Sequence, residues 1–147
     1  MLRGYAAKVV GIPAFASLNT ALRGRLAEIL TMISQPRVLN AGDVLFQQGA
    51  EDESTGAILV EGILSVTADG GPAISVAAPD LLGEMQQFDQ YGQRTATVTA
   101  EGPVTVLEFS WHEFVSRIRE TPTITKEDQA AVKSALEAYA NKRLHQL

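Results

Sequence analysis

The chain has 147 residues, of which 46% are hydrophobic and 20% are charged, and its net charge is −5. This length is typical of one domain, and an acidic chain is a poor candidate for binding nucleic acid. The absence of cysteine excludes disulfides, cysteine-ligated metal sites and a cysteine nucleophile. The only histidines are His112 and His145, and no Gly-x-Ser-x-Gly motif occurs. We therefore expect a binding protein and not an enzyme, with no metal or other cofactor.

No segment of the sequence predicts a membrane span, which needs about 18 apolar residues in a row. The best apolar run, 56–60, is interrupted by Glu61. We therefore expect no membrane contact, and the absence of cysteine fits the reducing cytoplasm. No acidic residue precedes Glu28, whereas four basic residues do, a bias that is also typical of transit peptides. An ordinary amphipathic helix explains this segment too, because its leucine spacing continues smoothly into the domain.

Residues 1–35 are predicted to be helical. Leucine recurs at every fourth position, and Ile29 and Ile33 lie beside the same face, which indicates an amphipathic helix packed on a core. Ser17 and Asn19 are candidate N-caps for this helix. The recurring leucines are Leu18, Leu22, Leu26 and Leu30.

Residues 36–109 have the pattern of a β domain, with short β-forming runs between turns rich in Gly, Pro, Asn and Asp. Apolar and polar residues alternate, so that in the run 63–67 Leu64 and Val66 would face the core. Strands at this spacing predict an antiparallel sandwich or roll. The predicted strands are 37–39, 44–47, 57–60, 63–67, 73–77, 95–100 and 104–109.

Residues 110–147 are predicted to be helical again. Ser110 would cap a short helix that contains Trp111 and Phe114 and ends at Thr121-Pro122. A second helix is expected from Lys126 to the end of the chain. One stripe of this helix contains Val132, Leu136, Tyr139 and Arg143.

One insert, residues 83–93, does not alternate and indicates a helical turn and a loop set inside the sheet. Gly83 would let the backbone pass close to a ligand, and the amides that open a short helix attract anions. Arg94 follows and has a guanidinium that can bind two oxygens of one phosphate. Glu84 has the wrong charge for a phosphate but suits a sugar hydroxyl. A sugar hydroxyl beside a singly charged phosphate describes a cyclic nucleotide.

The pair Gly83-Glu84, followed ten positions after Glu84 by Arg94-Thr95-Ala96-Thr97-Val98, resembles the phosphate-binding cassette of cyclic nucleotide-binding domains. The run 39–46 (Leu-Asn-Ala-Gly-Asp-Val-Leu-Phe) and the turns Gln48-Gly49 and Glu61-Gly62 resemble the early β-roll signature of this family. The family includes the bacterial catabolite activator protein, kinase regulatory subunits and gated channels.

The resemblance covers nearly the whole chain and implies an α+β fold. Its centre is an eight-stranded antiparallel β-roll, a jelly-roll-like double-stranded β-helix. An N-terminal helix, a short cassette helix at 85–88 and C-terminal helices surround it. The expected unit is one domain, 1–147, in which 1–35 is the N-terminal helical segment, 36–109 the β-roll and 110–147 the C-terminal helices.

The resemblance also implies a role for each residue of the cassette. Glu84 would accept a hydrogen bond from the ribose 2′-hydroxyl, and Arg94 would pair with the cyclic phosphate. Gly83 and the amides near Met85 and Gln86 would line the sugar and phosphate.

Two further residues concern the base. Thr95 would lie beside the phosphate and the purine; threonine here is associated in the family with tolerance of cGMP, yet the choice between cAMP and cGMP stays open. Tyr139 falls where the bacterial activator presents a hydroxyl residue to the purine, so its ring is a candidate to stack on the base.

These observations predict a sensor of cAMP or cGMP that reports through its C-terminal helix. No output domain is visible, so the signal would pass to a separate effector protein or domain, and a homodimer through the last helix is a further expectation. Two departures from the family pattern, Gln86-Gln87 and Thr55-Gly56-Ala57, keep an alternative open. This alternative is a degenerate β-roll that acts in protein interaction or binds another small ligand.

Overall fold

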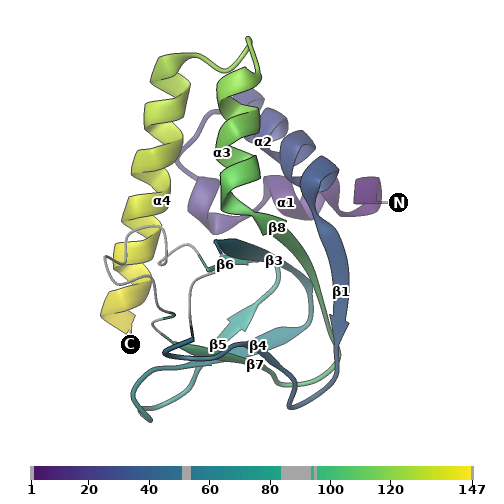
Figure 1. The fold of residues 1–147 in the computed structure, drawn as a ribbon, viewed down its shortest axis with the longest axis vertical. Coiled ribbons are helices and arrows are strands. Elements are labelled where there is room, and N and C mark those ends of the chain that lie inside the picture. Colours follow the sequence, from purple (N-terminus) through teal and green to yellow (C-terminus); the bar gives the residue numbers. More distant parts are fainter. Residues whose placement is uncertain (1, 51–53, 84–93, 95, 147) are drawn as a thin grey trace.

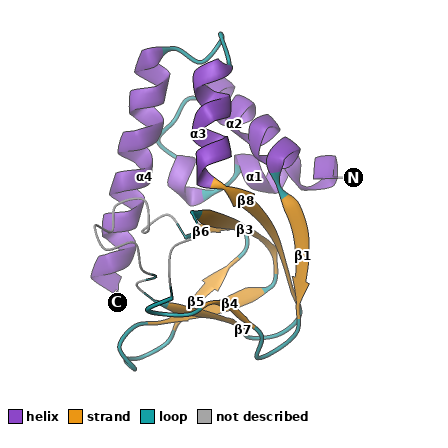
Figure 2. Ribbon diagram, viewed as in Figure 1, coloured by secondary structure: helices purple, strands orange, loops and turns teal. Residues whose placement is uncertain are grey.

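Two four-stranded sheets form the lower half of the molecule, and the helices gather above one of them (Figures 1 and 2). The structure is a computed structural model that describes residues 2–50, 54–83, 94 and 96–146. Every strand pair is antiparallel. Sheet A has the order β1-β8-β3-β6, and sheet B the order β2-β7-β4-β5. The strands are β1 Gln35–Leu39, β2 Val44–Phe46, β3 Thr55–Glu61, β4 Ile63–Thr67, β5 Ile74–Ala77, β6 Asp80–Leu82, β7 Thr97–Ala100 and β8 Val104–Ser110.

The helices come before and after the strands in the sequence but pack together in space. The first group and the last group both cover the outer face of sheet A, while the outer face of sheet B stays bare of described helices (Figure 1). The helices are α1 Ala6–Val10, α2 Thr20–Ile33, α3 Trp111–Glu120 and α4 Lys126–Gln146, with short 3-10 turns at Leu2–Tyr5 and Pro13–Phe15.

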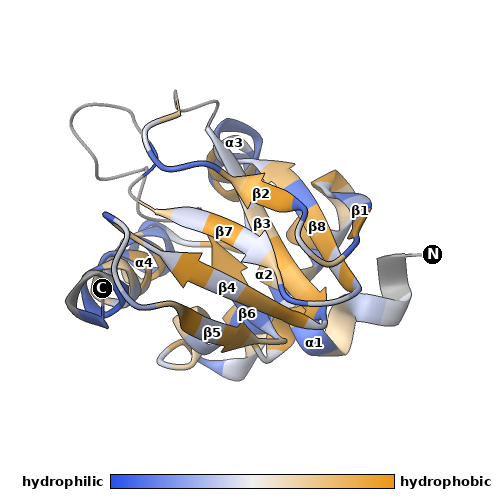
Figure 3. Ribbon diagram, turned by 90° about the horizontal axis from the view of Figure 1, so that it is seen from below, coloured by the Kyte–Doolittle hydropathy of each residue, from blue (hydrophilic) through white to orange (hydrophobic). Residues whose placement is uncertain are grey.

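Sheet A separates two hydrophobic cores. Strand β3 contributes to both, because Ile58 and Val60 face the helices whereas Ala57 and Leu59 face the interior of the roll. The roll interior is closed from below by the inward residues of sheet B. Figure 3 shows that apolar and polar residues alternate along β4 and β7. Leu64 of β4 is one of the apolar residues buried in the interior of the roll. Strand β3 of sheet A is thus covered by apolar side chains on both faces, whereas four of the five residues of β1 are exposed.

The expected α+β fold, an antiparallel β-roll with helices at both ends of the chain, is confirmed. Two of the three candidate caps form: the Asn19 side chain accepts from the Leu22 amide at 2.8 Å, and the Ser110 hydroxyl accepts from the Glu113 amide at 3.2 Å. The prediction of Ser17 as a cap was wrong, because α2 begins at Thr20 and its N-cap is Asn19. Helix α3 ends at Glu120, immediately before the predicted break. The expected cassette helix at 85–88 lies outside the described residues.

Strand β6 is absent from the pattern-based strand prediction. It has three residues, all buried, so it shows no alternation of apolar and polar positions. Pro79 directly precedes it, which further disguises it as part of a loop. The eighth strand was expected only from the family resemblance.

The turn at Gly62 carries the chain from sheet A to sheet B through a narrow gap. Gly62 has a φ of +97°, and a Cβ there would lie 2.6 Å from the carbonyl oxygen of Pro103 and 2.9 Å from Cγ2 of Val104. Gly42 provides a comparison, because its φ is +88° but a Cβ there would meet nothing within 4 Å. The two glycines share the backbone constraint and differ in the space around them.

We predict that Gly62→Ala lowers the free energy of unfolding more than Gly42→Ala does. A left-handed conformation costs alanine about 1–2 kcal/mol at either position. At Gly62 the forced close contact adds about 1–3 kcal/mol. Urea denaturation of both variants measures the difference, and equal losses would show that the turn relaxes to admit a methyl group.

Candidate functional site

Arg94 is anchored to the turn between β2 and β3. Its carbonyl oxygen accepts from the Gly49 amide at 2.8 Å, and its own amide donates to the Ala50 carbonyl at 3.0 Å. These two bonds form a short ladder between Arg94 and the turn. The backbone position of Arg94 is therefore fixed by a segment more than 40 residues earlier in the sequence.

The Arg94 side chain is buried, with 8% of its residue surface exposed. Its Nη2 donates to the carbonyl oxygen of Thr55 at 2.9 Å, and its Cζ lies 3.7 Å from the centre of the Phe46 ring. A hydrogen bond and a cation–π contact thus hold the guanidinium from β3 and β2. Together they orient a planar donor group that can bind two oxygens of an anion.

Gly83 lies directly against this guanidinium. Its φ is +89°, and a Cβ there would lie 2.9 Å from the Thr55 carbonyl oxygen and 3.1 Å from Nη1 of Arg94. Any side chain at this position would press on Arg94, which explains why the position needs glycine. The structure therefore brings together two of the predicted site residues, Gly83 and Arg94.

Charge sets Arg94 apart from the rest of the roll. The sequence from 36 to 109 contains eleven acidic residues and two basic ones, Arg37 and Arg94. Arg37 lies at the surface, where its Nη1 is 3.1 Å from Oε1 of Glu108. Arg94 is thus the one buried basic residue of a span whose sequence is mainly acidic.

The other predicted cassette residues lie outside the described residues. These residues are Glu84, Met85, Gln86 and Thr95. Their roles toward the ribose, the phosphate and the base stay predictions.

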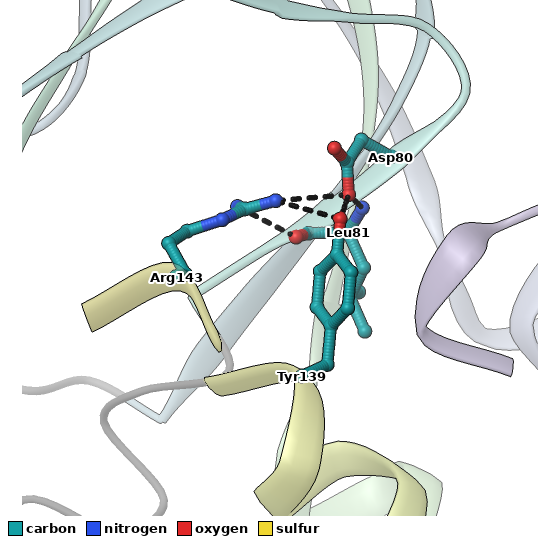
Figure 4. A network of polar contacts seen from close by, with 4 residues as sticks. All are labelled: Asp80, Leu81, Tyr139 and Arg143. Carbon is teal, nitrogen blue, oxygen red and sulfur yellow. Dashed lines mark hydrogen bonds and ion pairs between the residues drawn. The ribbon is translucent and has the colours of Figure 1, made fainter. Parts of the chain in front are cut away.

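Tyr139 on α4 belongs to a buried polar network (Figure 4). Its hydroxyl donates to Oδ1 of Asp80 at 2.6 Å, and the same oxygen lies 3.0 Å from Nη2 of Arg143. Arg143 also donates through Nη2 to the Tyr139 hydroxyl at 2.9 Å and through Nη1 to the Leu81 carbonyl at 3.1 Å. The network links α4 to β6, the strand that leads into Gly83. The predicted stacking of the Tyr139 ring on a base stays a prediction.

The sequence analysis did not identify Asp80 or Arg143 as site residues. A signal for Arg143 was present, because it occupies the apolar stripe of the last helix, where an arginine needs a buried partner. The partner could not be chosen from the sequence, since Asp80 is 63 positions away and only one of many acidic residues.

The described residues form no group of three or more His, Asp or Glu side chains that could hold a metal ion. Within the same part of the chain, no helix combines the length and the apolar character that crossing a bilayer requires.

A comparison with protein-family models finds the cyclic nucleotide-binding domain over residues 36–121. This match covers more than half of the chain and spans Gly83, Arg94 and all of the strands except the first residue of β1. The chain belongs to the cyclic nucleotide-binding domain family. A search of the curated proteins found no match to the sequence.

Solved structures of cyclic nucleotide-binding domains share the fold. A cAMP-bound PfPKA-R is similar with a TM-score of 0.66 and 17% identity, over 94% of this chain and 47% of that one. The regulatory domain of Toxoplasma gondii PKA with cAMP is similar with a TM-score of 0.67 and 19% identity, over 96% of this chain and 50% of that one. The sensor domain of the transcriptional regulator DNR from Pseudomonas aeruginosa is similar with a TM-score of 0.65 and 21% identity, over 99% of this chain and 91% of that one. The chain spans about half the length of the two kinase-type chains.

We predict that the ion pair between Asp80 and Arg143 behaves as a buried pair. Asp80→Asn would leave the Arg143 charge buried without its counter-ion, at a cost of about 3–5 kcal/mol in the free energy of unfolding. The double variant Asp80→Asn/Arg143→Met should lose less than the sum of the two single losses, because neither of these two positions then carries a charge.

Urea denaturation of the two single variants and the double variant measures this coupling. Glu108→Gln is the matched control, since it removes the partner of the exposed Arg37 and should cost at most about 1 kcal/mol. Additive losses for Asp80 and Arg143 would contradict the prediction.

Proposed function

We propose that this protein is a sensor that binds a cyclic nucleotide, cAMP or cGMP, in the β-roll and does not catalyse a reaction. The observation that carries the proposal is the approach of Gly83 to the Arg94 guanidinium within a cyclic nucleotide-binding domain. Two of the similar structures, PfPKA-R and the regulatory domain of Toxoplasma gondii PKA, contain bound cAMP, which supports the same class of ligand.

Arg94 would bind the cyclic phosphate. Its guanidinium is buried and oriented by Thr55 and Phe46, so that binding an anion needs little reordering of the side chain. Because Gly83 has no side chain, no Cβ presses on Nη1 from a distance of 3.1 Å. Glu84 would accept from the ribose hydroxyl, and the amides near Met85 and Gln86 would complete the lining of the sugar and phosphate.

The choice between the two purines would depend on residues near the base. Thr95 directly follows Arg94, and a hydroxyl there can reach the 2-amino group of guanine. Tyr139 would meet the base from α4. The proposal leaves cAMP and cGMP as two arms of the binding experiment.

Binding would be reported through α4. Asp80 and Leu81 of β6 contact this helix directly, and β6 ends one residue before Gly83, so a ligand at Gly83 can favour one position of α4 over another. The change in α4 would be read by an effector protein or domain, or by a second copy of the chain, in the cytoplasm.

We predict that cAMP or cGMP raises the melting temperature of the wild-type protein and that Arg94→Ala abolishes most of this effect. A ligand at 100 times its dissociation constant stabilises by about 2.7 kcal/mol, which corresponds to a shift of roughly 5–10 °C in a chain of this size. Removing one partner of a buried charge pair costs about 2–5 kcal/mol, or roughly 30-fold to several thousand-fold in affinity.

Thermal melts and calorimetric titrations with each nucleotide test this prediction. Arg37→Ala is the matched control, because it removes the other arginine of the roll, which lies at the surface. A loss of affinity under about threefold in Arg94→Ala would refute the assignment of Arg94. No binding of either nucleotide by the wild type would favour a degenerate β-roll that serves protein interaction.

We predict that saturating nucleotide slows amide hydrogen exchange in α4, Lys126–Gln146, by at least about fivefold, the lower end of common coupling energies. Exchange in α2, Thr20–Ile33, which does not contact the site, serves as the internal reference. Unchanged protection of α4 at saturation would mean that the signal leaves the domain by another route.

A further inference from the structure

Strand β6 is a short edge strand. It has three residues and, among the described strands, pairs with β3 alone. An edge strand has one row of amide and carbonyl groups that face away from its neighbour, and these groups must find other partners when they are buried. All three residues of β6 are buried, so its free edge cannot rely on bulk water.

Side chains satisfy this free edge at Leu81. Its amide donates to Oδ1 of Asp80 at 2.7 Å, and its carbonyl oxygen accepts from Nη1 of Arg143 at 3.1 Å. Both peptide groups of Leu81 are thus bonded to side chains. Arg143 on α4 takes the place that a further strand would occupy.

The same side chains also bond to one another. Oδ1 of Asp80 accepts from the Leu81 amide and the Tyr139 hydroxyl, and it forms the ion pair with Nη2 of Arg143. We call the four residues Asp80, Leu81, Tyr139 and Arg143 the clasp. Asp80 and Arg143 are both more than nine-tenths buried, and Tyr139 is partly buried, so the clasp is a largely desolvated connection between β6 and α4.

We propose that Arg143 is a positioning residue of the ligand site, because it fixes β6 and thereby holds Gly83 against Arg94. Gly83 follows Leu81 by two residues, and a Cβ added to it would lie 2.9 Å from the Thr55 carbonyl oxygen and 3.1 Å from Nη1 of Arg94. Without the guanidinium of Arg143, the Leu81 carbonyl loses its donor and Asp80 loses its counter-ion. The end of β6 is then free to separate from β3, and the space beside Arg94 changes shape.

The proposal rests on the proposed function for its effect on binding but also has a readout that needs no ligand. In Arg143→Met, hydrogen exchange in a peptide that covers residues 80–82 should become at least about tenfold faster, while exchange in β4, Ile63–Thr67, stays unchanged. Affinity for cAMP or cGMP should fall by at least about tenfold, within the usual range of coupling between sites. Arg143→Lys, which keeps the charge, should recover part of the affinity.

Two control variants separate positioning from general stability. Lys142→Met makes the same chemical change one residue away on the exposed side of α4 and should leave both readouts at wild-type values. Ile118→Ala removes buried apolar contacts in α3 and should lower the unfolding free energy without changing the affinity of the folded protein. If Arg143→Met does not fold, Tyr139→Phe removes one hydroxyl from the clasp and should change both readouts in the same direction by a smaller factor.

Hydrogen exchange and nucleotide affinity of Arg143→Met together decide whether Arg143 positions the ligand site. Wild-type exchange in 80–82 for Arg143→Met would overturn the proposal. Faster exchange with unchanged nucleotide affinity would overturn the positioning role and leave the clasp as a structural link. A wild-type protein that binds neither nucleotide would refute the proposed function, while faster exchange would still support the control of β6 by Arg143.

Discussion

Burial of strand β3 of sheet A on both faces is the constraint on which the rest of the structure depends. Five consecutive residues of β3, Gly56–Val60, are buried, so every peptide group along this strand needs a partner within the protein. Strand β8 provides partners on one side and β6 on the other. The outer edge of β6 is also buried, so its peptide groups need partners too. Arg143 of α4 donates to one of them, the Leu81 carbonyl oxygen. The packing of the last helix thus follows from the hydrogen-bonding needs of a strand in the middle of the chain.

The same dry interior contains a cation beside Gly83. Removing a guanidinium from water is costly, and the roll offsets this cost with the Thr55 carbonyl and the face of the Phe46 ring. Both contacts orient the guanidinium of Arg94. A guanidinium that is buried and held in one orientation needs little reordering to bind an anion, as the proposed function requires of Arg94.

Local patterns in the sequence predicted the elements whose causes are local. The caps at Asn19 and Ser110 form because a side chain reaches an amide three residues ahead, and the alternation in β4 follows from burial of one face. The juxtaposition of Gly83 and Arg94 could be expected only through the resemblance to a family. The pairing of Asp80 with Arg143 could not be predicted, because it depends on where α4 crosses β6, and that crossing is a property of the assembled cores. Strand β6 was not predicted for a related reason. A strand that is buried on both faces lacks the alternation of apolar and polar residues by which strands are recognised in a sequence.

The excess of acidic residues in the span 36–109 has a consequence for discrimination among anions. Long-range repulsion from such a roll grows with the charge of the approaching molecule, whereas the attraction of Arg94 acts on one phosphate at short range. A cyclic monophosphate has a single negative charge, and a nucleoside triphosphate has about four, so the triphosphate meets roughly four times the repulsion for the same local contact. Under the proposed function, the acidic roll would therefore disfavour the abundant polyphosphates of a cell by charge alone, before any contact with the base is made. Because this repulsion acts through solvent, dissolved salt would weaken it while leaving the buried contacts of Arg94 largely intact.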